Sequence, residues 1–125
     1  MENITPVVGM GATLHFPQDT YPYVIVAVSK SGKSATIERL HTVDKSTGHE
    51  PSRFDGPFSV WDHVYTPEEL QAHRYTKEEI ERFEAARVYT GEKFLTTIRL
   101  GKNGWGYKGL RFTVGTARYH RNFSY

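Results

Sequence analysis

The sequence predicts a mostly β (α+β) protein: an antiparallel, partly closed SH3-like barrel or a sandwich with a short central helical insert. Short segments of alternating apolar and polar residues, separated by turn residues, fill about 11–65 and about 93–123. Between them, about 66–88 changes to a helical period. A chain of 125 residues has the length of one domain, so we expect 1–125 to fold as a single unit.

The N-terminal half is predicted to form strands joined by turns. Residues 23–28 are a continuous apolar, β-branched run, which is typical of a central strand buried on both faces. The Ser-Lys-Ser-Gly sequence at 29–32 predicts a hairpin turn after it. Residues 44–57 contain two glycines and two prolines and predict a long loop. The predicted strands of this half are 12–16, 23–28, 34–40 and 58–65.

The central insert carries helix-start signals. Residues 66–69 place a threonine N-cap, a proline at the first helical position and a capping-box glutamate in order. Residues 76–79 repeat the capping signal. The pattern predicts two short helices, or one helix broken near Tyr75, packed by Leu70, Ile80 and Phe83.

Strands resume in the last third. Residues 93–100 alternate, and the Asn103-Gly104 pair that follows is the strongest short hairpin signal. The remaining predicted strands are 105–108, 110–114 and 118–123.

One segment matches a nucleotide-binding motif. Residues 27–34 fit a relaxed P-loop pattern that ends in Gly-Lys-Ser. A P-loop needs a helix next, so that the helix N-terminal amides face the phosphates. Residues 34–40 have a β pattern instead, so we expect a hairpin turn here, with Lys33 still free to contact a phosphate as a point charge.

Charge and aromatic residues gather at the C-terminal end. Residues 89–125 carry seven basic and one acidic side chain, a net +6, against +2 for the whole chain. They also hold eight of the seventeen aromatic residues. Cations interleaved with rings suit phosphates and bases, whereas the alternative is an edge strand protected by charge. The candidate nucleotide-binding residues are Arg111, Arg118, Arg121 and Lys33 for phosphates and Trp105, Tyr107 and Tyr119 for bases.

Trp105 has a structural alternative, and the two arginines of 118–121 carry a geometric condition. Trp105, like Phe112, is favoured as a core residue over a ligand contact. Arg118 and Arg121 face opposite sides of a regular strand, so they serve one pocket only if a bulge or a neighbouring subunit completes it.

Other function classes lack their residues. The chain has no cysteine, and its six histidines show no metal-ligand spacing. No serine lies in a nucleophile context, and the clustered glutamates suit a solvated helix face, so we expect no enzyme activity, metal or cofactor. No apolar run is long enough to span a membrane and the N-terminus is not a secretory signal, which predicts a cytoplasmic protein without a membrane partner.

Several short motifs resemble a known group of proteins. They are GMGAT at 9–13, DTYPY at 19–23, VSKSGK at 28–33, KNGW at 102–105 and VGTARY at 114–119. In these the chain resembles a widespread group of small phage proteins, most of which have no assigned function. The resemblance extends to phage sponge proteins that sequester the cyclic nucleotide signals of the bacterial CBASS immune system.

The match covers roughly 9–40 and 99–125, and the central region 62–92 does not align with it. It implies a homo-oligomer in the infected bacterial cell that binds a cyclic dinucleotide without cleaving it. The alternative is an SH3-like protein-interaction module that inhibits a host protein, in which Phe54 and Phe58 matter more. A barrel for long nucleic acid is a third class, against which the net charge of +2 argues. The apolar content of 38% with many aromatics also favours an oligomer.

Overall fold

The computed structural model describes residues 5–17, 19–42, 60–90, 94–102 and 104–122; the side chains of 60–62, 87–90, 121 and 122 are outside this description. The described chain contains eight strands and two helices. In chain order they are β1 (Gly11–His15), β2 (Thr20–Val28), β3 (Ser34–Arg39), β4 (Val60–Val64), α1 (Pro67–Ala72), α2 (Lys77–Thr90), β5 (Leu95–Gly101), β6 (Gly104–Tyr107), β7 (Leu110–Gly115) and β8 (Arg118–Asn122).

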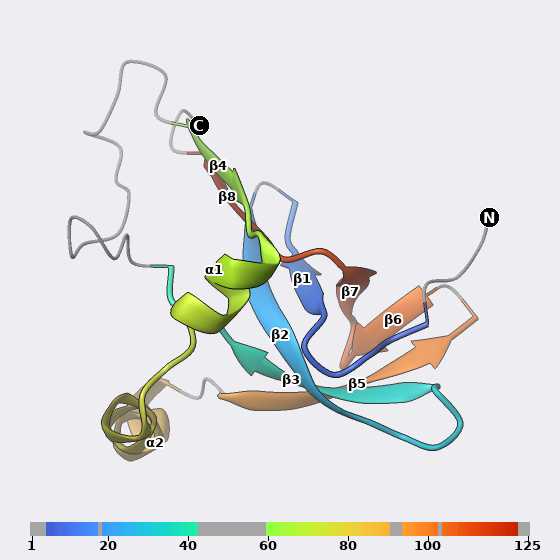
Figure 1. Ribbon diagram of the computed structural model, residues 1–125, viewed down its shortest axis with the longest axis horizontal. Coiled ribbons are helices and arrows are strands. Elements are labelled where there is room, and N and C mark those ends of the chain that lie inside the picture. Colours follow the sequence, from blue (N-terminus) through green and yellow to red (C-terminus); the bar gives the residue numbers. More distant parts are fainter. Residues whose placement is uncertain (1–4, 18, 43–59, 91–93, 103, 123–125) are drawn as a thin grey trace.

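Six of the strands close into an antiparallel barrel (Figure 1). Their order is β1-β7-β6-β5-β3-β2, and β2 pairs with β1 to complete the circle. β8 leaves the barrel, joins β2 through the Thr20–His120 pair and forms a two-stranded ribbon with β4. The predicted mostly β antiparallel barrel is confirmed and is consistent with an SH3-like barrel; the barrel closes completely rather than partly.

β2 is buried on both faces, as its apolar run predicts. Tyr23 and Ile25 point into the barrel, whereas Val24 points into a second cluster under β8 and α1. A register shift between Ile25 and Ala27 bends the strand, which lets it pair with β1, β3 and β8 along its length.

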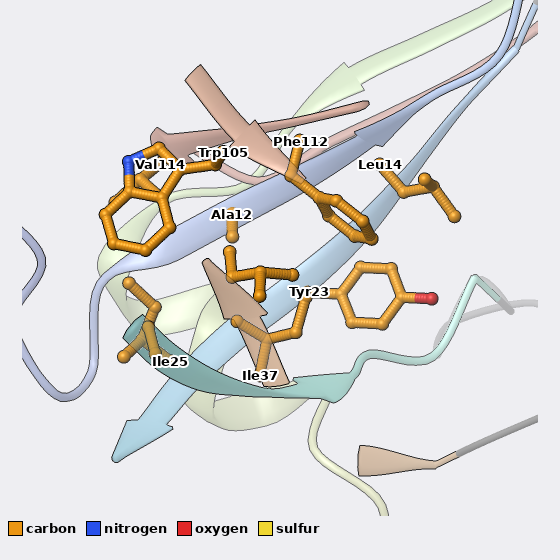
Figure 2. Packing of buried hydrophobic residues seen from close by; sticks show 10 residues of the cluster. Ala12, Leu14, Tyr23, Ile25, Ile37, Trp105, Phe112 and Val114 are labelled. Carbon is orange, nitrogen blue, oxygen red and sulfur yellow. The ribbon is translucent and has the colours of Figure 1, made fainter. Parts of the chain in front are cut away.

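The barrel core is a single group of apolar side chains (Figure 2). Trp105 and Val114 lie at one end of this group, and Leu14, Phe112 and Tyr23 lie at the other, with the Tyr23 hydroxyl directed away from the rest. The second cluster holds the ribbon and α1 against β2, and its buried residues are Val24, Leu40, Tyr65, Leu70, Ala117 and Tyr119.

The helical insert lies to one side of the barrel as two helices (Figure 1). Thr66 caps α1 in a complete capping box with Glu69, as predicted. Thr76 accepts from the Glu79 N–H and donates its own N–H to the Glu79 side chain, which repeats the arrangement at α2. None of the described helices is long and apolar enough to cross a bilayer.

The predicted turns are confirmed where the structure describes them. The hairpin at 29–32 joins β2 to β3 with Gly32 at φ 73°, and β3 follows directly, so the P-loop-like segment is a turn. The predicted loop over 44–57, which contains Phe54, lies outside the described residues, as does Phe58. The structure contains one chain, and the homo-oligomer stays a prediction.

Candidate functional site

One end of the barrel opens into a hollow of about 500 Å³, which we call the mouth. It lies where the β6–β7 turn, the end of β1 and the starts of β2 and β5 meet. Five aromatic rings and two cationic side chains line it, and no carboxylate occurs among the described residues that do so. The lining residues are Leu14, Phe16, Tyr21, Tyr23, Arg39, Thr96, Tyr107, Lys108, Leu110 and Phe112.

Strand alternation brings the rings together. Tyr21 and Tyr23 are two residues apart on β2, so both side chains leave the strand on one face. The Tyr23 ring lies edge-on to Phe112, with centroids 6.0 Å apart, and Tyr21 lies edge-on to Phe16 at 5.7 Å. Phe16 is 42% exposed, whereas Tyr23 and Phe112 are buried, so the ring wall runs from solvent into the core.

The two cations of the mouth are Arg39 and Lys108. Arg39 ends β3, pairs in register with Tyr23, and places its guanidinium carbon 5.5 Å from the Phe83 ring centroid. α2 therefore helps to hold Arg39 in position. The Lys108 ammonium lies 5.4 Å from the centroid of the Tyr107 ring beside it.

The β6–β7 turn holds Lys108 in an unfavourable backbone conformation. Tyr107 pairs with Leu110, and the two residues between them, Lys108 and Gly109, have φ 47° and 83°. Two positive φ values characterise a type I′ turn, which normally carries asparagine, aspartate or glycine. Lys108 is the one non-glycine residue with positive φ in the described part of the chain.

A second hollow lies on the outer face of β5, β6 and β7; we call it the basic groove. It measures about 840 Å³ and is lined by four cations, four glycines and no acidic residue among those described. Arg99, Gly106 and Arg111 are register neighbours across the three strands, and His15 of β1 continues the row. The cations are Arg99, Lys102, Lys108 and Arg111, and the glycines are Gly101, Gly104, Gly106 and Gly109.

The pKa of His15 indicates a positive electrostatic potential beside this groove. Its Nε2 lies 2.9 Å from the Thr113 hydroxyl oxygen. Burial lowers the pKa of His15 below 6.5, and the charges of Arg111 and Arg118 lower it further. The structure thus brings Arg111 and Arg118, both predicted ligand residues, to the surroundings of one imidazole.

The predicted site residues divide into several places. Tyr107 lines both hollows, and Arg111 lines the basic groove, as does Trp105, which is 8% exposed and belongs to the barrel core. Lys33 lies beside Leu100 at the opposite end of β3 and β5 from the mouth.

The other three predicted site residues lie on β8. Arg118 is exposed at its start. Tyr119 is 1% exposed within the second cluster, so its ring offers no free face for stacking. The side chain of Arg121 lies outside the described residues.

Among the rings and cations of the mouth, the sequence predicted only Tyr107 as a ligand residue and placed Phe112 in the core. The missed residues are Phe16, Tyr21, Tyr23, Arg39 and Lys108. The Tyr-Pro-Tyr spacing at 21–23 contains a signal, because it places two rings on one face of a strand. Arg39 could be placed beside them only once the β2–β3 register was known.

Two histidine–carboxylate pairs lie at the junction of the helical insert and the barrel. His63 Nε2 is 2.7 Å from Glu69 Oε2, and His41 Nε2 is 2.6 Å from Glu79 Oε2. Glu69 also accepts the Thr66 N–H, which is the main reason that its pKa is lowered. Both carboxylates belong to helix caps, so these pairs serve to attach the helices.

These pairs do not extend to a larger site within the described residues. No group of three or more His, Asp or Glu side chains there could hold a metal ion. The mouth contributes rings and cations, and its described lining contains neither a carboxylate nor a histidine to act as a base.

Comparisons with known proteins find no relative with which this site can be compared. No family model matches the chain, no curated protein matches it, and no solved structure matches it. The resemblance to small phage proteins therefore stays a prediction, as does the sponge function that it implies.

Proposed function

We propose that the protein binds a small nucleotide in the mouth of its barrel and sequesters it without cleaving it. The observation that carries this proposal is the convergence of five rings and two cations, Arg39 and Lys108, on one hollow of about 500 Å³. Ligand pockets usually measure about 300–1,000 Å³, so the volume suits a small molecule.

Each part of the mouth matches a part of a nucleotide. A base that stacks on an aromatic side chain gains about 1–3 kcal/mol, and Tyr21 and Tyr107 are half-buried rings at the opening. A guanidinium such as that of Arg39 pairs with a phosphate through two parallel hydrogen bonds. Lys108 supplies a second positive charge nearby.

Sequestration is the role that this chemistry favours. A sponge needs affinity and no reacting group, and the described lining of the mouth has no carboxylate or histidine to act as a general base. The resemblance to phage proteins points to a cyclic dinucleotide signal of bacterial immunity as the ligand. The basic, aromatic character of 89–125 supports the same ligand class.

Calorimetry tests the proposal with a panel of cyclic di- and trinucleotides. Wild type should bind at least one of them, and Arg39→Gln should weaken binding by about tenfold because it removes a charge-assisted phosphate contact. Lys30→Gln is the matched control, since Lys30 is an exposed cation in the β2–β3 turn. The nucleotide affinity of this variant should stay within about threefold of wild type. Chromatography after heating should recover the ligand intact.

Three results would count against the proposal. Cleaved ligand would make the protein an enzyme. An unchanged affinity of Arg39→Gln would place the ligand elsewhere. Absence of binding to any nucleotide would favour the protein-interaction module, for which Phe16, an exposed ring that lines the mouth, would be a candidate anchor among the described residues.

A further inference from the structure

The mouth and the basic groove meet at residues 107–110, which form the β6–β7 turn and its flanks. Tyr107, Lys108 and Leu110 line both hollows. The two hollows differ in chemistry: the mouth is rich in rings, whereas the groove is rich in cations. They therefore suit different parts of the same kind of molecule.

Two arginines and a glycine lie side by side in the groove. Arg99 and Arg111 flank Gly106 in register, so their backbones are two strand spacings apart, or ~9.6 Å. Gly106 has no side chain to fill the space between them, and a Cβ there would lie 3.2 Å from the Leu110 carbonyl oxygen. Neither arginine forms an ion pair within the described part of the chain.

Lys108 stands on the ridge between the two hollows. Lys108 lines both of them, and its backbone has the positive φ that lysine rarely adopts. Strained residues of this kind gather at ligand sites, where a side chain is needed despite its conformational cost. A positive charge at this position can contact a bound anion that extends from one hollow into the other.

We infer that one ligand occupies both hollows, with a base in the mouth and its phosphates crossing the ridge past Lys108 to Arg99 and Arg111. This inference rests on the proposed function and narrows it. The ligand class is a nucleotide with two or more phosphates, because a single phosphate held by Arg39 or Lys108 would leave the groove empty. A cyclic dinucleotide belongs to this class.

Two probes separate the hollows: AMP, with one base and one phosphate, and cyclic di-AMP, with two bases and two phosphates. Wild type should bind cyclic di-AMP at least about tenfold more tightly than AMP, because a second charge-assisted contact contributes about that much. The double variant R99A/R111A should lose this difference and keep its AMP affinity within about threefold. R39Q should weaken both probes. The control K30A/K77A removes two exposed cations elsewhere and should leave both affinities unchanged.

The outcomes distinguish this inference from the proposal beneath it. If R39Q weakens cyclic di-AMP binding and R99A/R111A does not, the ligand is confined to the mouth, and the inference falls while the proposed function stands. If neither set of variants changes the affinity, or neither probe binds wild type, the proposed function falls and the inference with it. Thermal melts of each variant exclude loss of fold as the cause of weaker binding.

Discussion

Lys108 offers a test in which stability and binding should move in opposite directions. Lys108→Asn replaces a lysine at φ 47° with a residue that tolerates this conformation. Relief of the left-handed backbone should stabilise the protein by about 1–1.5 kcal/mol, and loss of the contact with Tyr107 at 5.4 Å should cost about 0.5 kcal/mol. The variant should therefore be more stable than wild type by roughly 0.5–1 kcal/mol.

That gain is measurable by calorimetric melting. Unfolding entropy is about 2.1 cal/mol/K per residue, so over 125 residues the melting temperature should rise by about 2–4 °C. Nucleotide affinity should fall by about threefold to tenfold in the same variant, because the ridge loses its charge.

Lys102→Asn is the matched control, since it removes an equal charge from the β5–β6 turn at a residue without positive φ. Its melting temperature should stay within about 2 °C of wild type. A lower melting temperature for Lys108→Asn, or an affinity equal to that of wild type, would refute the assignment of a strained binding residue.

Three further predictions concern the charged contacts. Arg74→Met should lower the free energy of unfolding in urea by about 2 kcal/mol, because it leaves the buried Glu38 carboxylate without its two hydrogen bonds from Arg74; a loss below about 0.5 kcal/mol would contradict this. Glu69 has a lowered pKa, so its ionised carboxylate stabilises the fold above pH 4.5, and this stabilisation is lost as the pH falls through the pKa of the folded state. Glu69→Gln should therefore have a lower free energy of unfolding than wild type at pH 7, and the difference should shrink in acid. A difference that stays constant with pH would be inconsistent with this. Arg118→Ala should raise the pKa of His15 in an NMR titration, since it removes a charge that opposes protonation; an unchanged or lower pKa would count against the positive field.

Local signals predicted most of the fold. The capping residues at 66–69 and 76–79 and the turn at 29–32 each specify the backbone within a few residues. The apolar run at 23–28 predicted a strand buried on both faces because that property belongs to one segment.

What the sequence could not provide was the pairing of distant segments. Closure of the barrel depends on the β1–β2 and β1–β7 contacts, and nothing local in β1 specifies both partners. Tyr119 looked like a ligand residue within a basic segment, yet β8 turns over β2 and buries it. The mouth unites Phe16, Tyr23 and Arg39 with Tyr107, and no stretch of sequence holds them together.

The most direct test of the account is the location of bound nucleotide. Amide chemical shifts of isotopically labelled protein, followed while cyclic di-AMP is added, report which strands contact the ligand. We predict that the largest changes fall on Tyr23, Thr96 and Tyr107 around the mouth, with little change at the turn over 29–32 at the other end of the barrel. Largest changes at that turn or on α1, with an undisturbed mouth, would contradict the account.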